Sequence, residues 1–82
     1  LHLHPTWFAN RFSKLFGVAP REYVNRRRIA RAQELLWRDE APLKEIAAGV
    51  GIGDEFYFSR LFRKIAGMSP SAYREQRRLP EF

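Results

Sequence analysis

The chain has 82 residues, of which 45% are hydrophobic and 15% aromatic; this is ample for a buried core and excludes a disordered chain. Fifteen Lys and Arg residues against nine Asp and Glu give a formal charge of +6, which favours a polyanionic partner such as nucleic acid. There are no cysteines, which fits a reducing cytoplasm, where we expect the protein to act near the nucleoid. No apolar run approaches the ~18–20 residues of a membrane span, so no membrane partner is expected.

The first half of the chain is predicted to form two helices. The first covers about residues 5–16 and ends at Gly17, and the second, about residues 20–38, starts at Pro20 and is the longest. The apolar residues predicted to pack in the long helix are Tyr23, Val24, Ile29, Ala32, Leu35 and Leu36. Arg28 lies among them, and we expect it to be an internal ion-pair partner of Glu22, Glu34 or Asp39.

Residues 43–67 are predicted to form two further helices joined by a tight turn. In the first helix a buried stripe with the spacing i, i+3, i+4, i+7 consists of Leu43, Ile46, Ala47 and Val50. Pro42 is expected in its first turn, Gly51 is expected to end it in the left-handed conformation, and Asp54 is expected to cap the next helix. The stripe then recurs at Phe58, Leu61, Phe62 and Ile65. Basic and polar side chains lie opposite this stripe, as is typical of helix-turn-helix readers of the DNA major groove.

An internal repeat relates the two halves of the chain. Residues 7–28 align without gaps to residues 57–78, and eight of the 22 pairs are identical, among them Gly17 with Gly67 and Pro20 with Pro70. We therefore expect an all-α fold of two helix-turn-helix units joined by a long linker helix. Residues 1–19 are the recognition half of the first unit, which lacks its scaffold helix, and residues 20–38 are the linker helix. Residues 42–78 are the second unit with a C-terminal helix over about residues 70–78, and residues 79–82 are a tail.

Three segments resemble the AraC/XylS family of bacterial transcription regulators: I-A-A-G-V-G-I at 46–52, Y-F-S-R-L-F-R-K at 57–64 and G-M-S-P-S-A-Y-R at 67–74. Two upstream segments, F-G-V-A-P-R-E-Y at 16–23 and R-I-A-R-A-Q-E-L-L at 28–36, support the resemblance, which covers residues 1–78. It implies a DNA-binding domain usually attached to a separate effector-sensing or dimerisation domain. It also implies a regulator that most often activates transcription by contacting RNA polymerase. Phe56 departs from the family, in which small polar residues are common at that position.

Sequence readout requires side chains near the start of each recognition helix that reach base edges. In the second unit the candidates are Glu55, Phe56, Tyr57, Ser59 and Arg60. Arg60 is favoured because a guanidinium can bridge O6 and N7 of guanine, although it could instead contact a phosphate or form a surface salt bridge. Glu55 can accept from a cytosine amine or stabilise the helix N-terminus, and Phe56 can touch a thymine methyl group or pack at the helix start. In the first unit the candidates are Thr6, Ala9, Asn10 and Ser13.

Phosphate contacts are expected from cationic side chains beside the recognition helices and from backbone N–H groups at the start of the helix at residue 43. These candidates are Arg11, Lys14, Arg21, Leu43, Lys44, Arg63 and Lys64. The alternatives are a basic helical module for RNA or an anionic surface, and a domain that chiefly binds other proteins. An enzyme is not expected, because the chain has no catalytic triad, nucleotide loop or metal cluster, and no cofactor is implied. His2 and His4 have a possible metal-ligand spacing but no further ligand beside them.

Overall fold

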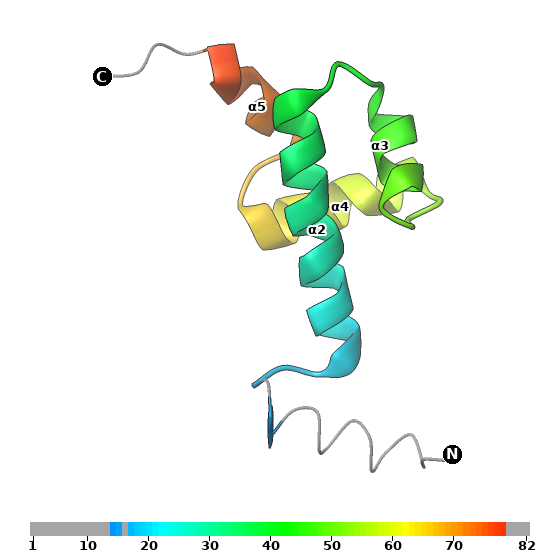
Figure 1. The fold of residues 1–82 in the computed structure, drawn as a ribbon, viewed down its shortest axis with the longest axis vertical. Coiled ribbons are helices and arrows are strands. Elements are labelled where there is room, and N and C mark those ends of the chain that lie inside the picture. Colours follow the sequence, from blue (N-terminus) through cyan, green and yellow to red (C-terminus); the bar gives the residue numbers. More distant parts are fainter. Residues whose placement is uncertain (1–13, 16, 79–82) are drawn as a thin grey trace.

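The computed structural model describes residues 14, 15 and 17–78, and the structural statements below concern these residues. They form the α-helices α2 (Pro20–Arg38), α3 (Leu43–Gly49), α4 (Glu55–Ala66) and α5 (Pro70–Glu75), followed by a 3-10 turn over Gln76–Arg78. Helix α2 runs along the molecule and α4 crosses it, while α3 and α5 lie towards the C-terminal end of α2 (Figure 1). This part of the chain has no strand, in agreement with the all-α prediction. None of its helices is long and apolar enough to cross a membrane.

The predicted first helix falls mostly outside the described residues. Lys14 and Leu15 are helical, and both are exposed. The long helix has the predicted bounds. By contrast, the C-terminal helix is α-helical only to Glu75 and tightens to a 3-10 turn through Arg78, where a single helix was predicted.

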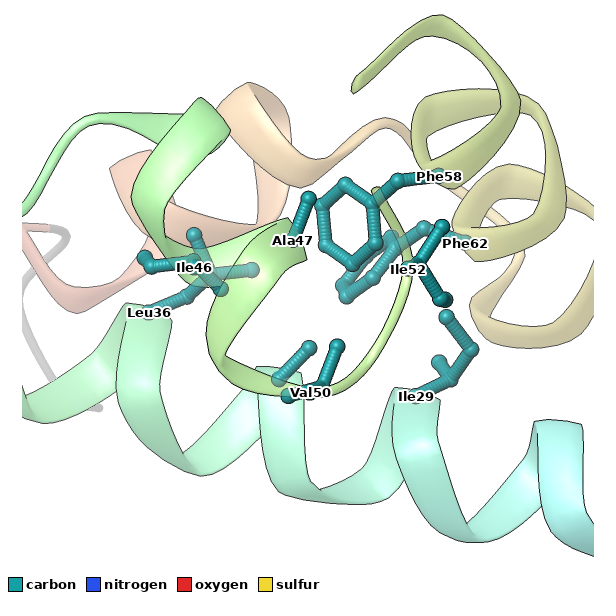
Figure 2. Packing of buried hydrophobic residues seen from close by; sticks show 9 residues of the cluster. Ile29, Leu36, Ile46, Ala47, Val50, Ile52, Phe58 and Phe62 are labelled. Carbon is teal, nitrogen blue, oxygen red and sulfur yellow. The ribbon is translucent and has the colours of Figure 1, made fainter. Parts of the chain in front are cut away.

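The hydrophobic core lies where α2, α3 and α4 meet (Figure 2). Helix α4 contributes Phe58 and Phe62, both fully buried, with ring centroids 5.8 Å apart. The remaining buried core residues are Ile29, Ala32, Leu36, Ile46, Ala47, Val50 and Ile52. The predicted stripes are therefore correct in the middle of each helix, but Val24 is 43% exposed and Ile65 is 36% exposed. Both were predicted to pack, and both lie outside this core cluster.

The turn between α3 and α4 follows the expected chemistry. Gly51 has a φ of +87°, in the left-handed region that favours glycine. The Ile52 N–H donates to the Ala47 carbonyl at 2.9 Å, and the Ile52 side chain is buried between the helices. Asp54 caps α4, since its carboxylate accepts from the N–H groups of Phe56 at 2.8 Å and Tyr57 at 3.2 Å.

The predicted position of Pro42 was also wrong. It is the N-cap of α3 in an extended conformation, with ψ of 151°, rather than a residue of the first helical turn. Its carbonyl accepts from the N–H groups of Glu45 and Ile46, at 3.0 and 3.1 Å. Pro42 has no side-chain oxygen, so it offers no acceptor to the N–H groups at the start of α3.

The internal repeat is also a repeat of backbone conformation. Gly17 and Gly67 both have positive φ, at +77° and +88°. Pro20 and Pro70 then each begin a helix after a residue in the extended conformation. The copies differ at that preceding residue, because Ser69 accepts from the Ala72 N–H whereas Ala19 has no side-chain acceptor.

Two C-terminal arginines hold the end of α2 against α5. Arg77 donates through Nη1 to the carbonyls of Leu36, Trp37 and Asp39 at 3.3–3.4 Å, and it pairs with Glu40. Arg74 donates through Nη2 to the Ala41 carbonyl at 2.7 Å. The last carbonyls of a helix have no partner within it, so Arg77 satisfies oxygens at the end of α2 that would otherwise need water. Arg74 does the same for a carbonyl of the loop that follows α2.

Replacing Phe62 by alanine should lower the free energy of unfolding by about 3–5 kcal/mol, because the fully buried ring leaves a cavity between α2, α4 and α5. Urea unfolding followed by circular dichroism measures the change. Ile65→Ala on the same helix is the matched control, and we expect it to cost less than about 1 kcal/mol because its side chain is partly exposed. Equal losses for the two variants would contradict the position of the core.

Replacing Asp54 by alanine should cost about 1 kcal/mol, the usual value for an N-cap, because the N–H groups of Phe56 and Tyr57 lose their acceptor. Asp54→Asn keeps a side-chain oxygen and should retain most of the stability. The shift in urea midpoint for the two variants, compared with the unchanged protein, measures both effects. The capping assignment would be wrong if asparagine were as destabilising as alanine.

Candidate DNA interface

Helix α4 has one face in the core and an opposite face in solvent. Phe58 and Phe62 occupy the inner face. Phe56, Arg60 and Arg63 follow one another at helical spacing on the outer face, and all three are exposed. Phe56 is the most exposed large hydrophobic residue described, at 76%, so the interpretation that it packs at the helix start is wrong.

The remaining base-contact candidates of α4 are less exposed. Glu55, Tyr57 and Ser59 are all half-buried. Tyr57 packs against the edge of the core, on the side of the helix that faces α2. Of the five candidates on this helix, Phe56 and Arg60 therefore project furthest into solvent.

The acidic side chains are largely engaged within the protein. Four of them form ion pairs: Glu22 with Arg26 at 2.8 Å, Glu34 with Arg31 at 2.9 Å, Glu75 with Arg78 at 3.6 Å, and Glu40 with Arg77. Asp39 and Asp54 accept from backbone N–H groups. Within the described part of the chain, the cations of α4 have neither an ion pair nor a hydrogen bond; these are Arg60, Arg63 and Lys64. The outer face of α4 thus carries positive charge that pairs with no carboxylate of the described residues.

An open groove of about 550 Å³ separates α4 from the N-terminal half of α2. Helix α2 contributes Arg21 and Asn25 to its walls, and α4 contributes Tyr57, Arg60 and Lys64. A smaller hollow of about 370 Å³ shares Arg21, Asn25 and Tyr57 with it and adds Arg28. We call these two hollows together the basic groove. It brings together three predicted site cations, Arg21, Arg60 and Lys64, from two different helices.

Arg28 is a residue of this groove that the sequence reasoning missed. Its Cζ, Nε and Nη2 atoms each lie 3.4 Å from the point where a β-carbon on residue 51 would sit, so the guanidinium lies against the turn between α3 and α4. It forms no ion pair among the described residues, so the predicted internal salt bridge is wrong. Helical spacing explains why, because Glu22 and Glu34 are each six residues away and do not face it. Their partners, Arg26 and Arg31, lie four and three residues away.

The other predicted phosphate contacts on described residues are not part of the groove lining. Lys44 is exposed on α3, and the N–H groups of Leu43 and Lys44 have no acceptor among the described residues. Lys14 is exposed near the start of the described chain. Several candidates lie outside the described residues: Thr6, Ala9, Asn10, Arg11, Ser13 and the His2–His4 pair. Among the residues that are described, no group of His, Cys, Asp or Glu could hold a metal ion.

Comparison with known proteins places this architecture in a family. The sequence profile of a helix-turn-helix domain family matches residues 1–76. The chain is 39% identical over 75 residues to YisR of Bacillus subtilis, an uncharacterised HTH-type transcriptional regulator, covering 92% of this chain and 26% of that protein. It is 33% identical over 72 residues to the arabinose operon regulatory protein of Salmonella typhimurium, covering 88% of this chain and 26% of that protein. The chain therefore spans about a quarter of the length of these curated relatives.

Solved structures agree with the sequence match. The C-terminal domain of AraT, a response regulator from Geobacillus stearothermophilus, superposes with a TM-score of 0.89 at 32% identity, over 98% of this chain and 66% of that one. The DNA-binding domain of AdpA, a global transcriptional factor solved in complex with a target DNA, superposes with a TM-score of 0.86 at 30% identity, over 99% and 75%. With the profile match over nearly the whole chain, these likenesses show that the chain belongs to the AraC/XylS family of helix-turn-helix transcription regulators.

Proposed function

We propose that this chain binds double-stranded DNA sequence-specifically, with α4 in the major groove. The observation that carries the proposal is the outer face of α4, where Arg60, Arg63 and Lys64 have no acidic partner among the described residues. A helix is about 10–12 Å across and fits the major groove, which is about 12 Å wide. The likeness to a domain solved in complex with a target DNA supports DNA binding by this chain.

A second recognition helix, the one predicted over residues 5–16, would enter the next major groove on the same face of the duplex. The 19 residues of α2 span about 28 Å, close to the roughly 34 Å between successive major grooves. We therefore infer a bipartite site with two half-sites about one helical turn apart. The base contacts proposed for the first half-site are those of Thr6, Ala9, Asn10 and Ser13.

Within the second half-site the proposed roles follow from position. Arg60 bridges O6 and N7 of a guanine, while Glu55, Phe56, Tyr57 and Ser59 complete the contacts to base edges. The phosphate contacts come from Arg11, Lys14, Arg21, Lys44, Arg63 and Lys64 and from the N–H groups of Leu43 and Lys44. We add Arg28 to this set, because its guanidinium lies in the basic groove with no ion-pair partner among the described residues.

We further infer the role of the whole protein from its family. It acts as a bacterial transcription regulator in the cytoplasm, and it activates transcription through contact with RNA polymerase. An effector-sensing or dimerisation domain accompanies the DNA-binding domain. No catalytic activity or cofactor is part of this proposal.

Replacing Arg60 by alanine should relax the preference for guanine at one base pair and cost about 1–3 kcal/mol of discrimination there. Arg60→Lys keeps the charge but loses the planar fork, and it should recover overall affinity more than selectivity. Selection of duplexes from a random pool, with sequencing of the bound fraction, gives the preference of each variant. An unchanged base preference in Arg60→Ala would exclude direct readout by this residue.

Replacing Lys64 by alanine should weaken binding to all duplexes alike and reduce the slope of log K against log [salt] by about 0.9, the value for one lost phosphate contact. Arg38→Ala is the matched control, because Arg38 is an exposed cation at the opposite end of α2 from the basic groove. It should leave the slope unchanged. Titrations of labelled duplex at several salt concentrations measure both slopes, and identical slopes for the two variants would contradict a specific phosphate contact.

Competition with single-stranded RNA in the same assay tests the RNA alternative.

A further inference from the structure

Phe56 occupies a position on α4 that packing within the protein does not explain. Its side chain is 76% exposed, whereas Phe58 and Phe62 on the same helix are completely buried. Its backbone N–H donates to the Asp54 carboxylate at 2.8 Å, which holds the first turn of α4 in place. The ring is therefore an apolar group presented to solvent from an anchored backbone. Its exposed area is therefore accessible to a ligand.

From this position we infer that Phe56 reads the C5-methyl group of a thymine in the major groove. The inference rests on the proposed function, since it requires α4 to lie in that groove. Base edges in the major groove present hydrogen-bonding groups with one apolar exception, the thymine methyl group. A phenylalanine ring has no hydrogen-bond donor or acceptor. It can therefore distinguish one base from another only by contact with this methyl group. Phe56 is then a specificity residue that distinguishes thymine from cytosine by shape and hydrophobicity.

The spacing between Phe56 and Arg60 on α4 predicts how far this thymine lies from the guanine proposed for Arg60. Phe56 and Arg60 are four residues apart and lie on the same exposed face. One turn of helix advances about 5.4 Å, and successive base pairs are about 3.4 Å apart. The thymine, on either strand, therefore lies one or two base steps from that guanine.

Uracil tests this contact, because it differs from thymine only by the missing methyl group and keeps the same hydrogen-bonding edge. The binding site is first obtained by selection from a random pool, and each thymine in it is then replaced singly by deoxyuridine. Removing one contacted methyl group should weaken binding of the unchanged protein about fourfold at a single position, from the burial of one such group. Phe56→Ser should bind the thymine and uracil duplexes equally at that position, while thymines elsewhere affect both proteins alike.

A second substitution checks the direction of the effect. Cytosine at the contacted position should bind poorly, and 5-methylcytosine should recover affinity for the unchanged protein and not for Phe56→Ser. Phe56→Ser should keep the urea midpoint of the unchanged protein, because the ring is exposed.

Three results decide between this inference and the function on which it rests. A Phe56-dependent uracil effect one or two steps from the Arg60-dependent guanine supports the inference. An enriched sequence with no uracil effect that depends on Phe56 overturns the inference alone and leaves DNA recognition standing. A pool in which no sequence is enriched overturns both.

Discussion

The burial of Phe58 and Phe62 determines what the protein can present to a partner. Both rings are fully buried against α2 and α3, and they are four residues apart, so they fix the rotation of α4 about its own axis. Residues on the opposite side of the helix must then face outwards, which is why Phe56, Arg60 and Arg63 are exposed together. The buried face and the exposed face of α4 are thus two consequences of one helical periodicity. The left-handed turn at Gly51 and the cap at Asp54 set where that helix begins.

The charged side chains also divide into a group with partners inside the protein and a group on the exposed face of α4. Glu22 and Glu34 form ion pairs along α2, Glu40 pairs with Arg77, and Asp54 caps α4. The cations Arg60, Arg63 and Lys64 on α4 have no acidic partner among the described residues. Arg74 and Arg77 belong to the structural group, because they bind carbonyls at the end of α2 and in the loop that follows it, across 33–41 residues of sequence. The partners of each arginine in this chain therefore decide whether we assign it a structural role or a binding role. The residue type alone does not distinguish these roles.

Local signals were enough to predict much of this fold. The spacing of Ile46, Ala47, Phe58 and Phe62, the glycine at the turn and the aspartate cap each act within a few residues, and the structure confirms all of them. Contacts between distant segments were not predictable in this way. Arg28 lies against Gly51 because α2 packs beside the turn between α3 and α4. The periodicity of residues within α2 does not indicate this contact. Val24 and Ile65 follow the apolar pattern, yet both lie outside the buried core cluster, and a pattern cannot show where a neighbouring helix ends.

In the proposed DNA complex, the phosphate contacts and the base contacts come from two adjacent surfaces that share Arg60, which also lines the basic groove. The basic groove between α2 and α4 gathers Arg21, Arg28 and Lys64, whose charges suit a phosphate backbone that is the same for every sequence. The first turns of α4 carry Phe56 and Arg60, one apolar and one able to donate two hydrogen bonds, and these match features that differ between bases. Tyr57 is half-buried, follows Phe56 in the chain and lines the groove together with Arg60, so it ties the position of the proposed base-contacting side chains to that of the cations. A shift of α4 against α2 would therefore move both sets together, so in the proposed complex the packing of Phe58 and Phe62 is a condition for specificity as well as for stability.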